Sequence, residues 1–324
     1  MPGTAVRESL RVVLGELPDL PHLPELPARG PGADLVGRTL ALLPDLGAQW
    51  TPTGWQVSDR AGADLRRASA WLAEDLDALE ELAAGWSGAL KVQVCGPWTL
   101  AATVELRTGR KALGDAGAVR DLGQALVEGT AAHVDGLRRR LPGARLVLQL
   151  DEPALPAVLA GAVPTPSGLS RLAAVDEPVA EQLLATTLRS LPDDVVPVVH
   201  CCAANAPVAL LRRAGARAVS LDGAVLGDPG ATEPLAEGLE AGLGLLLGVV
   251  PAGTADLPAA GAAVAAVRDW WRQVGLASEL LGRRVVPTPS CGLAGVTPAA
   301  ARAALARCRE AGRVLLDDPE GGRG

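Results

Sequence analysis

The sequence of 324 residues contains no Phe, Tyr or Ile, a single Asn and only two Lys, so Arg supplies nearly all of its 30 basic residues. The avoided residues share AT-rich codons, which is typical of a protein from a very GC-rich genome. Single Arg, Ala or Leu positions therefore carry little information. Leu, Val, Ala and Trp remain to build the core.

Several binding partners are excluded by what the chain lacks. Its net charge is −7 and it has no Lys/Arg block, so nucleic acid is not expected as a partner. No apolar run reaches the roughly 18 residues of a membrane helix, and no signal peptide is visible, so no membrane association is expected. No glycine fingerprint for dinucleotides or ATP occurs. The five scattered Cys indicate a cytoplasmic, reducing location.

The composition is that of a globular protein, with 48% hydrophobic and 21% charged residues. The length favours one large α/β or barrel domain over two ordinary ones. We therefore expect residues 1–324 to form a single domain.

Short apolar runs alternate with segments of helical period, which favours a parallel sheet or barrel. The six clearest predicted strands are Ala89–Cys95, Arg145–Asp151, Val195–Cys202, Ala216–Asp222, Leu243–Val250 and Arg284–Cys291. A seventh, broken by Pro, is His22–Pro27. Seven strands are one short of a closed (β/α)8 TIM barrel.

Helical segments fit between these strands. In Asp64–Ala84 the leucines recur at core-facing spacing, and Val119–Leu141 repeats the pattern. Arg7–Leu17 is also expected to be helical. Thr297 and Pro298 predict the N-cap and first position of the last helix. We expect a loop at residues 161–168.

Polar residues stand where the predicted strands end. They are Asp151, His200, Cys202, Asp222 and Cys291. In a parallel barrel such ends converge on one mouth, which is where active sites lie. His200 and Cys202 are two apart and share a face, and the set of one N, two S and one carboxylate suits Zn²⁺. Buried cysteines with a hydrogen-bonded core histidine would explain the spacing equally well.

The other cysteines and histidines have structural interpretations. Cys201 points to the face opposite His200, and Cys95 and Cys308 lack a ligand at metal spacing. His133 lies on a helix of charged and small residues and is expected at the surface. His22 lies in a Pro-rich segment and is expected to be structural.

The motifs VVHCC, AVSLD, PTPSCG, LQLDEPAL and CGPWTLA together resemble the catalytic barrel of the cobalamin-independent methionine synthase family. The resemblance covers most of the chain, to the helix after Cys291. It implies a zinc ion held by His200, Cys202 and Cys291, and by Asp222 where the family usually has Glu. It further implies that Asp151, and with less support Glu25, bind the amino acid homocysteine.

The activity implied by this resemblance is a methyl transfer. Zinc would hold the thiol of homocysteine as a thiolate, which attacks a methyl group to form methionine. The family's full-length members carry a second, N-terminal half that helps to bind the folate donor, and nothing of that size is present here. The methyl donor is therefore open between methyl-folate and a methyl-corrinoid, as used by some single-barrel relatives.

Two further departures from the family concern the first strand and an acid. The stretch Met1–Thr4 is similar to the tail of the family's first-strand motif, so we expect that strand to lie upstream of Met1 and a barrel lacking it here. The family has a His thought to donate a proton, but the matching residues 251–254 contain none. A preactivated methyl donor would suit such a barrel better.

Three alternative functions remain open from the sequence. The first is a corrinoid-dependent methyltransferase acting on another small thiol. The second is a barrel similar to uroporphyrinogen decarboxylase, which needs no metal and would be indifferent to loss of Cys202. The third is a non-catalytic zinc- or corrinoid-binding relative.

Overall fold

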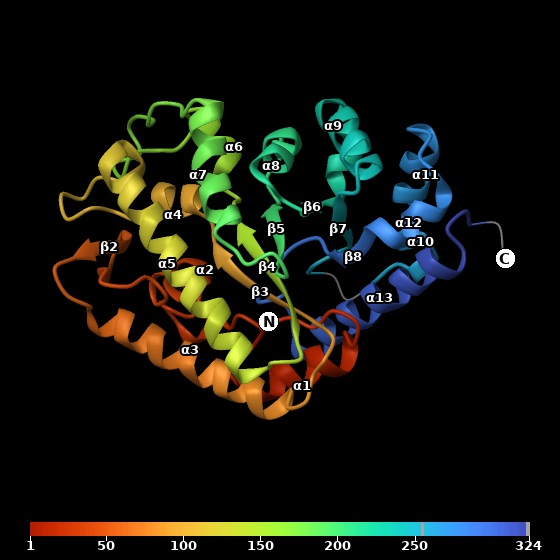
Figure 1. Cartoon of the computed structure of the whole chain (residues 1–324), viewed down its shortest axis with the longest axis horizontal. Coiled ribbons are helices and arrows are strands. Elements are labelled where there is room, and N and C mark those ends of the chain that lie inside the picture. The colour runs from red at the N-terminus through yellow and green to blue at the C-terminus, as the bar shows by residue number, and fades with distance from the viewer. Residues whose placement is uncertain (254–255, 322–324) are drawn as a thin grey trace.

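Six parallel strands form one curled sheet, in which strands that follow each other along the chain are neighbours (Figure 1). The structure is a computed structural model and describes residues 1–253 and 256–321. The strands are β3 (Ala89–Cys95), β4 (Arg145–Asp151), β5 (Val196–Cys201), β6 (Ala218–Asp222), β7 (Gly244–Val250) and β8 (Val285–Pro289). All six strands predicted from the sequence are present, with bounds that differ by at most two residues.

Helices surround this sheet, as in an α/β barrel, and the last of them also lines the cavity on its inner side. They are α1 (Val6–Glu16), α2 (Leu35–Leu40), α3 (Ala63–Leu82), α4 (Pro97–Thr103), α5 (Ala116–Arg140), α6 (Leu155–Leu159), α7 (Glu177–Arg189), α8 (Val208–Ala214), α9 (Pro229–Glu240), α10 (Ala260–Ala263), α11 (Ala265–Gln273), α12 (Ser278–Arg284) and α13 (Pro298–Asp317). Successive helices α5, α7, α8 and α9 pack against one another in chain order. The predicted cap holds, because the Thr297 side chain accepts a hydrogen bond from Ala300 N.

The strands alternate between two environments because side chains of a strand point to opposite faces. In β3 the residues Leu90, Val92 and Val94 are buried in the main core against the helices. Lys91 and Gln93 point instead to the inner side of the sheet, where they line a cavity. The inner side of this barrel is therefore polar at β3.

The sheet is a partial barrel that does not close. Within the described residues, the edge of β3 that faces away from β4 pairs with no strand and forms one isolated parallel bridge, between His22 and Lys91. The predicted strand over His22–Pro27 is therefore wrong. Pro24 and Pro27 have no N–H to donate to a ladder, and Pro27 begins a 3₁₀ turn, Pro27–Arg29.

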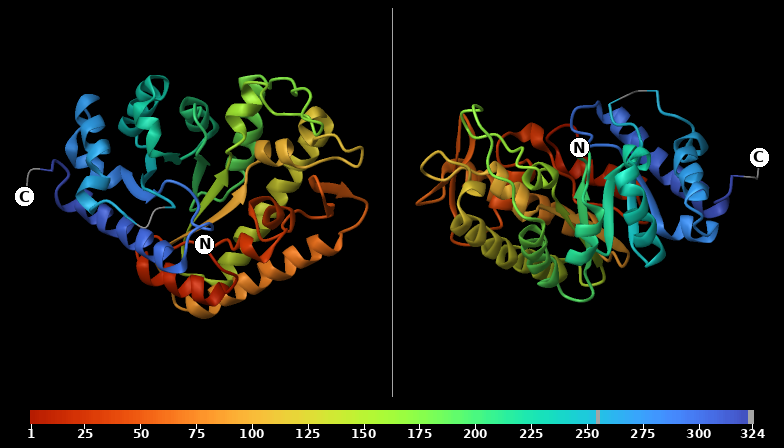
Figure 2. Two further views of the ribbon diagram at one scale, coloured as in Figure 1. Left: turned by 180° about the vertical axis from the view of Figure 1, so that it is seen from behind. Right: turned by 90° about the horizontal axis from the view of Figure 1, so that it is seen from above.

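Helices α1 and α13 bridge the two ends of the chain. They pack side by side (Figure 2). Glu16 of α1 forms ion pairs with two residues of α13, Arg302 at 2.7 Å and Arg309 at 3.4 Å. The fold is thus α/β, similar to a TIM barrel with strands missing. The sequence predicted this type of incomplete barrel, although with seven strands and not six.

A hairpin precedes the barrel strands and was not expected from the sequence. It consists of β1 (Gly47–Thr51) and β2 (Gly54–Ser58), which pair antiparallel. Trp55 is buried beneath it and packs edge-on against the more exposed Trp50. The hairpin closes a second hydrophobic cluster that includes Leu100 and Leu126.

His133 is buried, with 7% of its surface exposed, so the prediction of a surface position is wrong. It lies on α5 on the same stripe as Leu126, Thr130 and Leu137, all of which are fully buried. Burial lowers the pKa of His133 to about 4. The loop expected at residues 161–168 is present, and no helix of the described residues is long and apolar enough to cross a membrane.

Candidate active site

The register of the sheet places two of the polar strand-end residues, Asp151 and His200, in one row with Ser220. Asp151 of β4 is the register partner of His200 of β5, which in turn is the partner of Ser220 of β6. Register partners in neighbouring strands project to the same face. The sequence prediction that the ends of these strands converge is thus confirmed for Asp151 and His200.

His200 is held in one orientation by Ser220. Its Nδ1 lies 3.0 Å from the Ser220 carbonyl oxygen and 3.1 Å from Ser220 Oγ. A carbonyl can only accept, so Nδ1 carries the proton and Nε2 keeps its lone pair. Burial lowers the pKa of His200 to about 4, which keeps the imidazole neutral. A neutral ring with a free Nε2 is the form that binds a metal.

A cavity of about 650 Å³ extends from this row along the inner side of the sheet. Its wall includes four of the six residues that sequence reasoning assigned to the site: Glu25, Asp151, His200 and Cys291. Apolar residues such as Leu246 and Leu293 supply much of the rest. A concave, mostly apolar pocket with a few convergent polar groups is typical of a small-molecule site.

The other two residues, Cys202 and Asp222, lie outside this wall. The thiol of Cys202 is partly buried, and burial together with the charges of Cys291, Asp151 and Asp222 raises its pKa. Asp222 Oδ1 accepts a hydrogen bond of 2.8 Å from Ala224 N, at the end of β6. Both residues therefore lie at the same mouth as the row.

Among residues 1–253 and 256–321, no three side chains of His, Cys, Asp or Glu gather closely enough to hold a metal ion. The chemistry of the donors at the mouth nevertheless fits zinc. It offers the free Nε2 of His200, two thiols that are not in a disulfide, and the second oxygen of Asp222. These residues would have to draw together around the ion.

Asp151 is nearly buried at the end of β4. Its Oδ1 accepts a hydrogen bond of 2.7 Å from Gln149 Nε2, and 7% of the residue is exposed. Burial raises the pKa of Asp151 to about 6, opposed by the nearby charge of Lys91 and by the Gln149 hydrogen bond. A carboxylate of this kind favours binding of a cation, which would compensate its desolvation.

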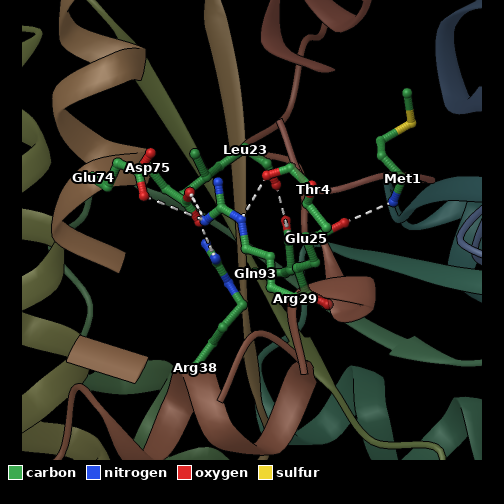
Figure 3. Close-up of polar contacts among 9 residues, drawn as sticks. All are labelled: Met1, Thr4, Leu23, Glu25, Arg29, Arg38, Glu74, Asp75 and Gln93. Atoms are coloured by element: carbon green, nitrogen blue, oxygen red, sulfur yellow. Dashed lines mark hydrogen bonds and ion pairs between the residues drawn. The ribbon is translucent and has the colours of Figure 1, made fainter. Parts of the chain in front are cut away.

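Glu25 reaches the cavity from the segment after α1. Burial raises its pKa, while the charge of Arg38 and a hydrogen bond from Gln93 act in the opposite direction. The Met1 amine donates to the Glu25 carbonyl at 2.7 Å, and Gln93 Nε2 donates to the Leu23 carbonyl at 2.9 Å (Figure 3). These contacts fix Glu25 beside β3.

Several polar residues of the cavity wall were missed by the sequence analysis. They are His22, Lys91, Gln93, Gln149 and Ser220. A signal for them exists, because each of the last four stands inside an apolar strand, at an even spacing from another residue of the inner face. Such interruptions of a buried strand indicate a polar barrel interior.

Directly after Asp151, Glu152 is buried and anchors α4. Its carboxylate accepts hydrogen bonds from Trp98 N at 2.9 Å, Thr99 N at 2.8 Å and Thr99 Oγ1 at 2.7 Å. A carboxylate at a helix N-terminus satisfies free N–H groups and complements the helix dipole. Glu152 thereby ties the end of β4, and with it Asp151, to α4.

We expect Gly96→Ala to lower stability by about 1 to 3 kcal/mol. A Cβ at position 96 would overlap the Glu152 carboxyl group, which would have to leave Trp98 and Thr99. Denaturant unfolding measures the change. Gly15→Ala is the matched control, since a Cβ there meets nothing within 4 Å and a helical Ala should be neutral or stabilising. Equal midpoints for both variants would contradict the anchoring role.

Comparisons with known proteins agree with the sequence resemblance. Residues 80–313 match the family model described as cobalamin-independent synthase, catalytic domain. The match spans most of the chain, so the chain belongs to the cobalamin-independent synthase family, as the sequence motifs predicted. A comparison with curated proteins gives no match.

One similar solved structure is a B12-independent methionine synthase from Shewanella sp. W3-18-1, in complex with selenomethionine. The alignment has a TM-score of 0.63 and 13% identity, and covers 97% of this chain and 88% of that chain. At this identity the similarity shows the fold. The TIM-barrel-like architecture is therefore confirmed by a solved structure.

Proposed function

We propose that the chain is a single zinc-binding methyltransferase barrel that methylates the thiol of homocysteine to form methionine. The observation that carries the proposal is the row of Asp151 and His200 at one mouth, with Cys202, Cys291 and Asp222 around it. Membership in the cobalamin-independent synthase family supports the same chemistry.

Zinc would be held by His200 Nε2, Cys202 and Cys291, with Asp222 as a fourth, weaker ligand. When bound, zinc supplies a Lewis acid that keeps a substrate thiol deprotonated at neutral pH. Asp222 is one methylene shorter than the Glu of the family, and its Oδ1 already caps Ala224. It would therefore be the weakest of the four ligands.

The chain's own residues bind and orient the amino acid. Asp151 and Glu25 accept hydrogen bonds from the α-ammonium group, and Gln149 fixes the rotamer of Asp151 through its 2.7 Å bond. Ser220 fixes the ring of His200. Apolar residues of the wall, such as Leu246 and Leu293, exclude water from the reacting sulfur. Positioning of this kind is worth orders of magnitude in rate.

The methyl donor stays open between methyl-folate and methyl-corrinoid, and a preactivated donor would suit this barrel better. Pro251, Ala252 and Gly253 follow β7 and bring no His to the position of the family's acid; Thr254, the last residue of that stretch, lies outside the described residues.

All five cysteines are free thiols, which supports a cytoplasmic location.

The test supplies homocysteine with methyl-tetrahydrofolate or with methylcobalamin and follows methionine by mass spectrometry. Methionine formation that is lost in Cys202→Ser and kept in Cys201→Ala would support the proposal, because Cys201 points into the core. No methionine with either donor from a zinc-loaded chain would contradict it in favour of a non-catalytic relative. Activity indifferent to Cys202 would contradict the zinc role.

A further inference from the structure

Lys91 has no role in the function proposed so far, although it lines the same cavity as Asp151 and Glu25. It stands on β3 with its side chain on the inner face of the sheet. Its Nζ donates one long hydrogen bond, 3.5 Å to Gln93 Oε1. An ammonium has three N–H donors, so most of its capacity is unused within the described part of the chain.

The two cavity carboxylates do not neutralise Lys91 by direct contact. Both Asp151 and Glu25 act on it electrostatically, yet among the described residues neither approaches its Nζ within the 4.0 Å of an ion pair. Burial lowers the pKa of Lys91, and these two carboxylates counteract the shift. A partly desolvated cation without an ion-pair partner is costly unless a ligand supplies one.

The amino-acid composition is a second observation that points to a binding role for Lys91. Lys occurs only at positions 91 and 111, in a chain that otherwise uses Arg for its basic residues. Lys carries a compact point charge on a flexible stem, whereas Arg presents a broad planar fork. A Lys retained inside the barrel therefore indicates a place where a small cation is needed.

The other basic side chains of the cavity wall lie elsewhere. Arg309 and Arg313 belong to α13, and the charges that act on Asp151 and Glu25 do not include theirs. Arg309 is also paired with Glu16. Burial keeps His200 and His22 neutral, with pKa values lowered to about 4 and about 3. Lys91 is therefore the basic side chain of the cavity wall whose charge acts on both Asp151 and Glu25.

We propose that Lys91 binds the α-carboxylate of the amino-acid substrate, while Asp151 and Glu25 bind its α-ammonium. This inference rests on the proposed function, because it names the part of homocysteine that each charge meets. One cation and two carboxylates on one wall complement a zwitterion, with each charged group meeting its opposite. The site is thereby specific for an α-amino acid over a simple thiol.

The test compares homocysteine with aminopropanethiol, which is homocysteine without its carboxylate. Titration calorimetry on the zinc-loaded protein gives both dissociation constants. The two compounds share the thiol and the amine, so the ratio of their dissociation constants isolates the carboxylate. The wild-type protein should bind homocysteine roughly 10- to 100-fold more tightly, as expected for a hydrogen bond between charged groups.

In Lys91→Met this preference should disappear through weaker binding of homocysteine, with aminopropanethiol unchanged. Lys91→Arg keeps the charge and should retain part of the preference. Lys111→Met is the matched control: Lys111 lies outside the cavity wall, next to Glu105, and its loss should leave both constants unchanged.

The outcomes separate the two proposals. Equal affinity of the wild-type protein for the two compounds, or a preference that survives Lys91→Met, would overturn the role of Lys91 and leave the proposed function intact. A wild-type protein that binds neither compound would overturn the proposed function itself. The wild-type ratio needs no variant, so a failure of Lys91→Met to fold does not remove the test.

Discussion

Asp151→Ala should weaken binding of homocysteine by about 100-fold, corresponding to about 3 kcal/mol for loss of one partner of a buried charge pair. Asp151 is nearly buried and held by Gln149, so its carboxylate is already oriented when the substrate enters. The α-ammonium would be left desolvated with only Glu25 as a charged partner. Titration calorimetry of the zinc-loaded protein measures this change.

The comparison compound for this prediction is sulfanylbutanoate, which is homocysteine without its amine. Its affinity should not fall in Asp151→Ala, because it has no ammonium to lose a partner. Asp19→Ala is the control variant, since Asp19 lines the same cavity but is exposed. An equal loss of affinity for both compounds would mean that Asp151 only maintains the shape of the mouth.

The second large effect is expected from a buried carboxylate outside the cavity. Asp75 of α3 has no exposed surface and forms ion pairs with Arg29, at 2.7 Å, and with Arg38 (Figure 3). Both guanidinium side chains are less than a tenth exposed. Arg29 Nε also donates to the Thr4 carbonyl at 2.9 Å. Asp75 thus joins α3 to α2 and to the segment that carries Glu25.

We expect Asp75→Ala to lower the free energy of unfolding by about 3 to 5 kcal/mol, because two buried guanidinium groups lose their counter-charge. This is a large part of the stability of a typical protein. Glu81→Ala removes the 2.6 Å pair with Arg7, in which both side chains are exposed, and should leave the unfolding midpoint nearly unchanged. Urea unfolding checks both, and equal midpoints would contradict the assignment.

The barrel strands were predictable because each is a short run of Val and Leu buried against helices. The hairpin β1–β2 was missed because Gly47–Thr51 and Gly54–Ser58 contain few such residues and are stabilised by Trp55 and by pairing with each other. Propensity alone does not reveal pairing that depends on tertiary packing. The strand expected at His22–Pro27 does not form, because its proline residues cannot donate the hydrogen bonds of a strand, although the segment lies beside β3.

The site was predictable where a motif sits at a strand end, as for Asp151 and His200. The polar inner face of β3 was not, although Lys91 and Gln93 interrupt an apolar strand at a spacing of two. Whether Lys91 and Gln93 face the cavity or the solvent depends on which face of β3 points inward, and an alternation of period two does not show this. The surface position predicted for His133 was wrong because the charged and small residues around it are typical of an exposed helix. His133 in fact continues the buried stripe of Leu126 and Leu137.

The central claim is a zinc ion held by thiols from two distant strand ends, and metal content tests it most directly. Zinc is measured per chain after purification without chelator, in the wild-type protein, Cys202→Ser, Cys291→Ala and the control Cys201→Ala, whose side chain is buried in the core. We predict about one zinc ion per chain in the wild type and the control, and loss of zinc in the other two. A wild-type protein without zinc, or zinc retained in both Cys202→Ser and Cys291→Ala, would contradict the account.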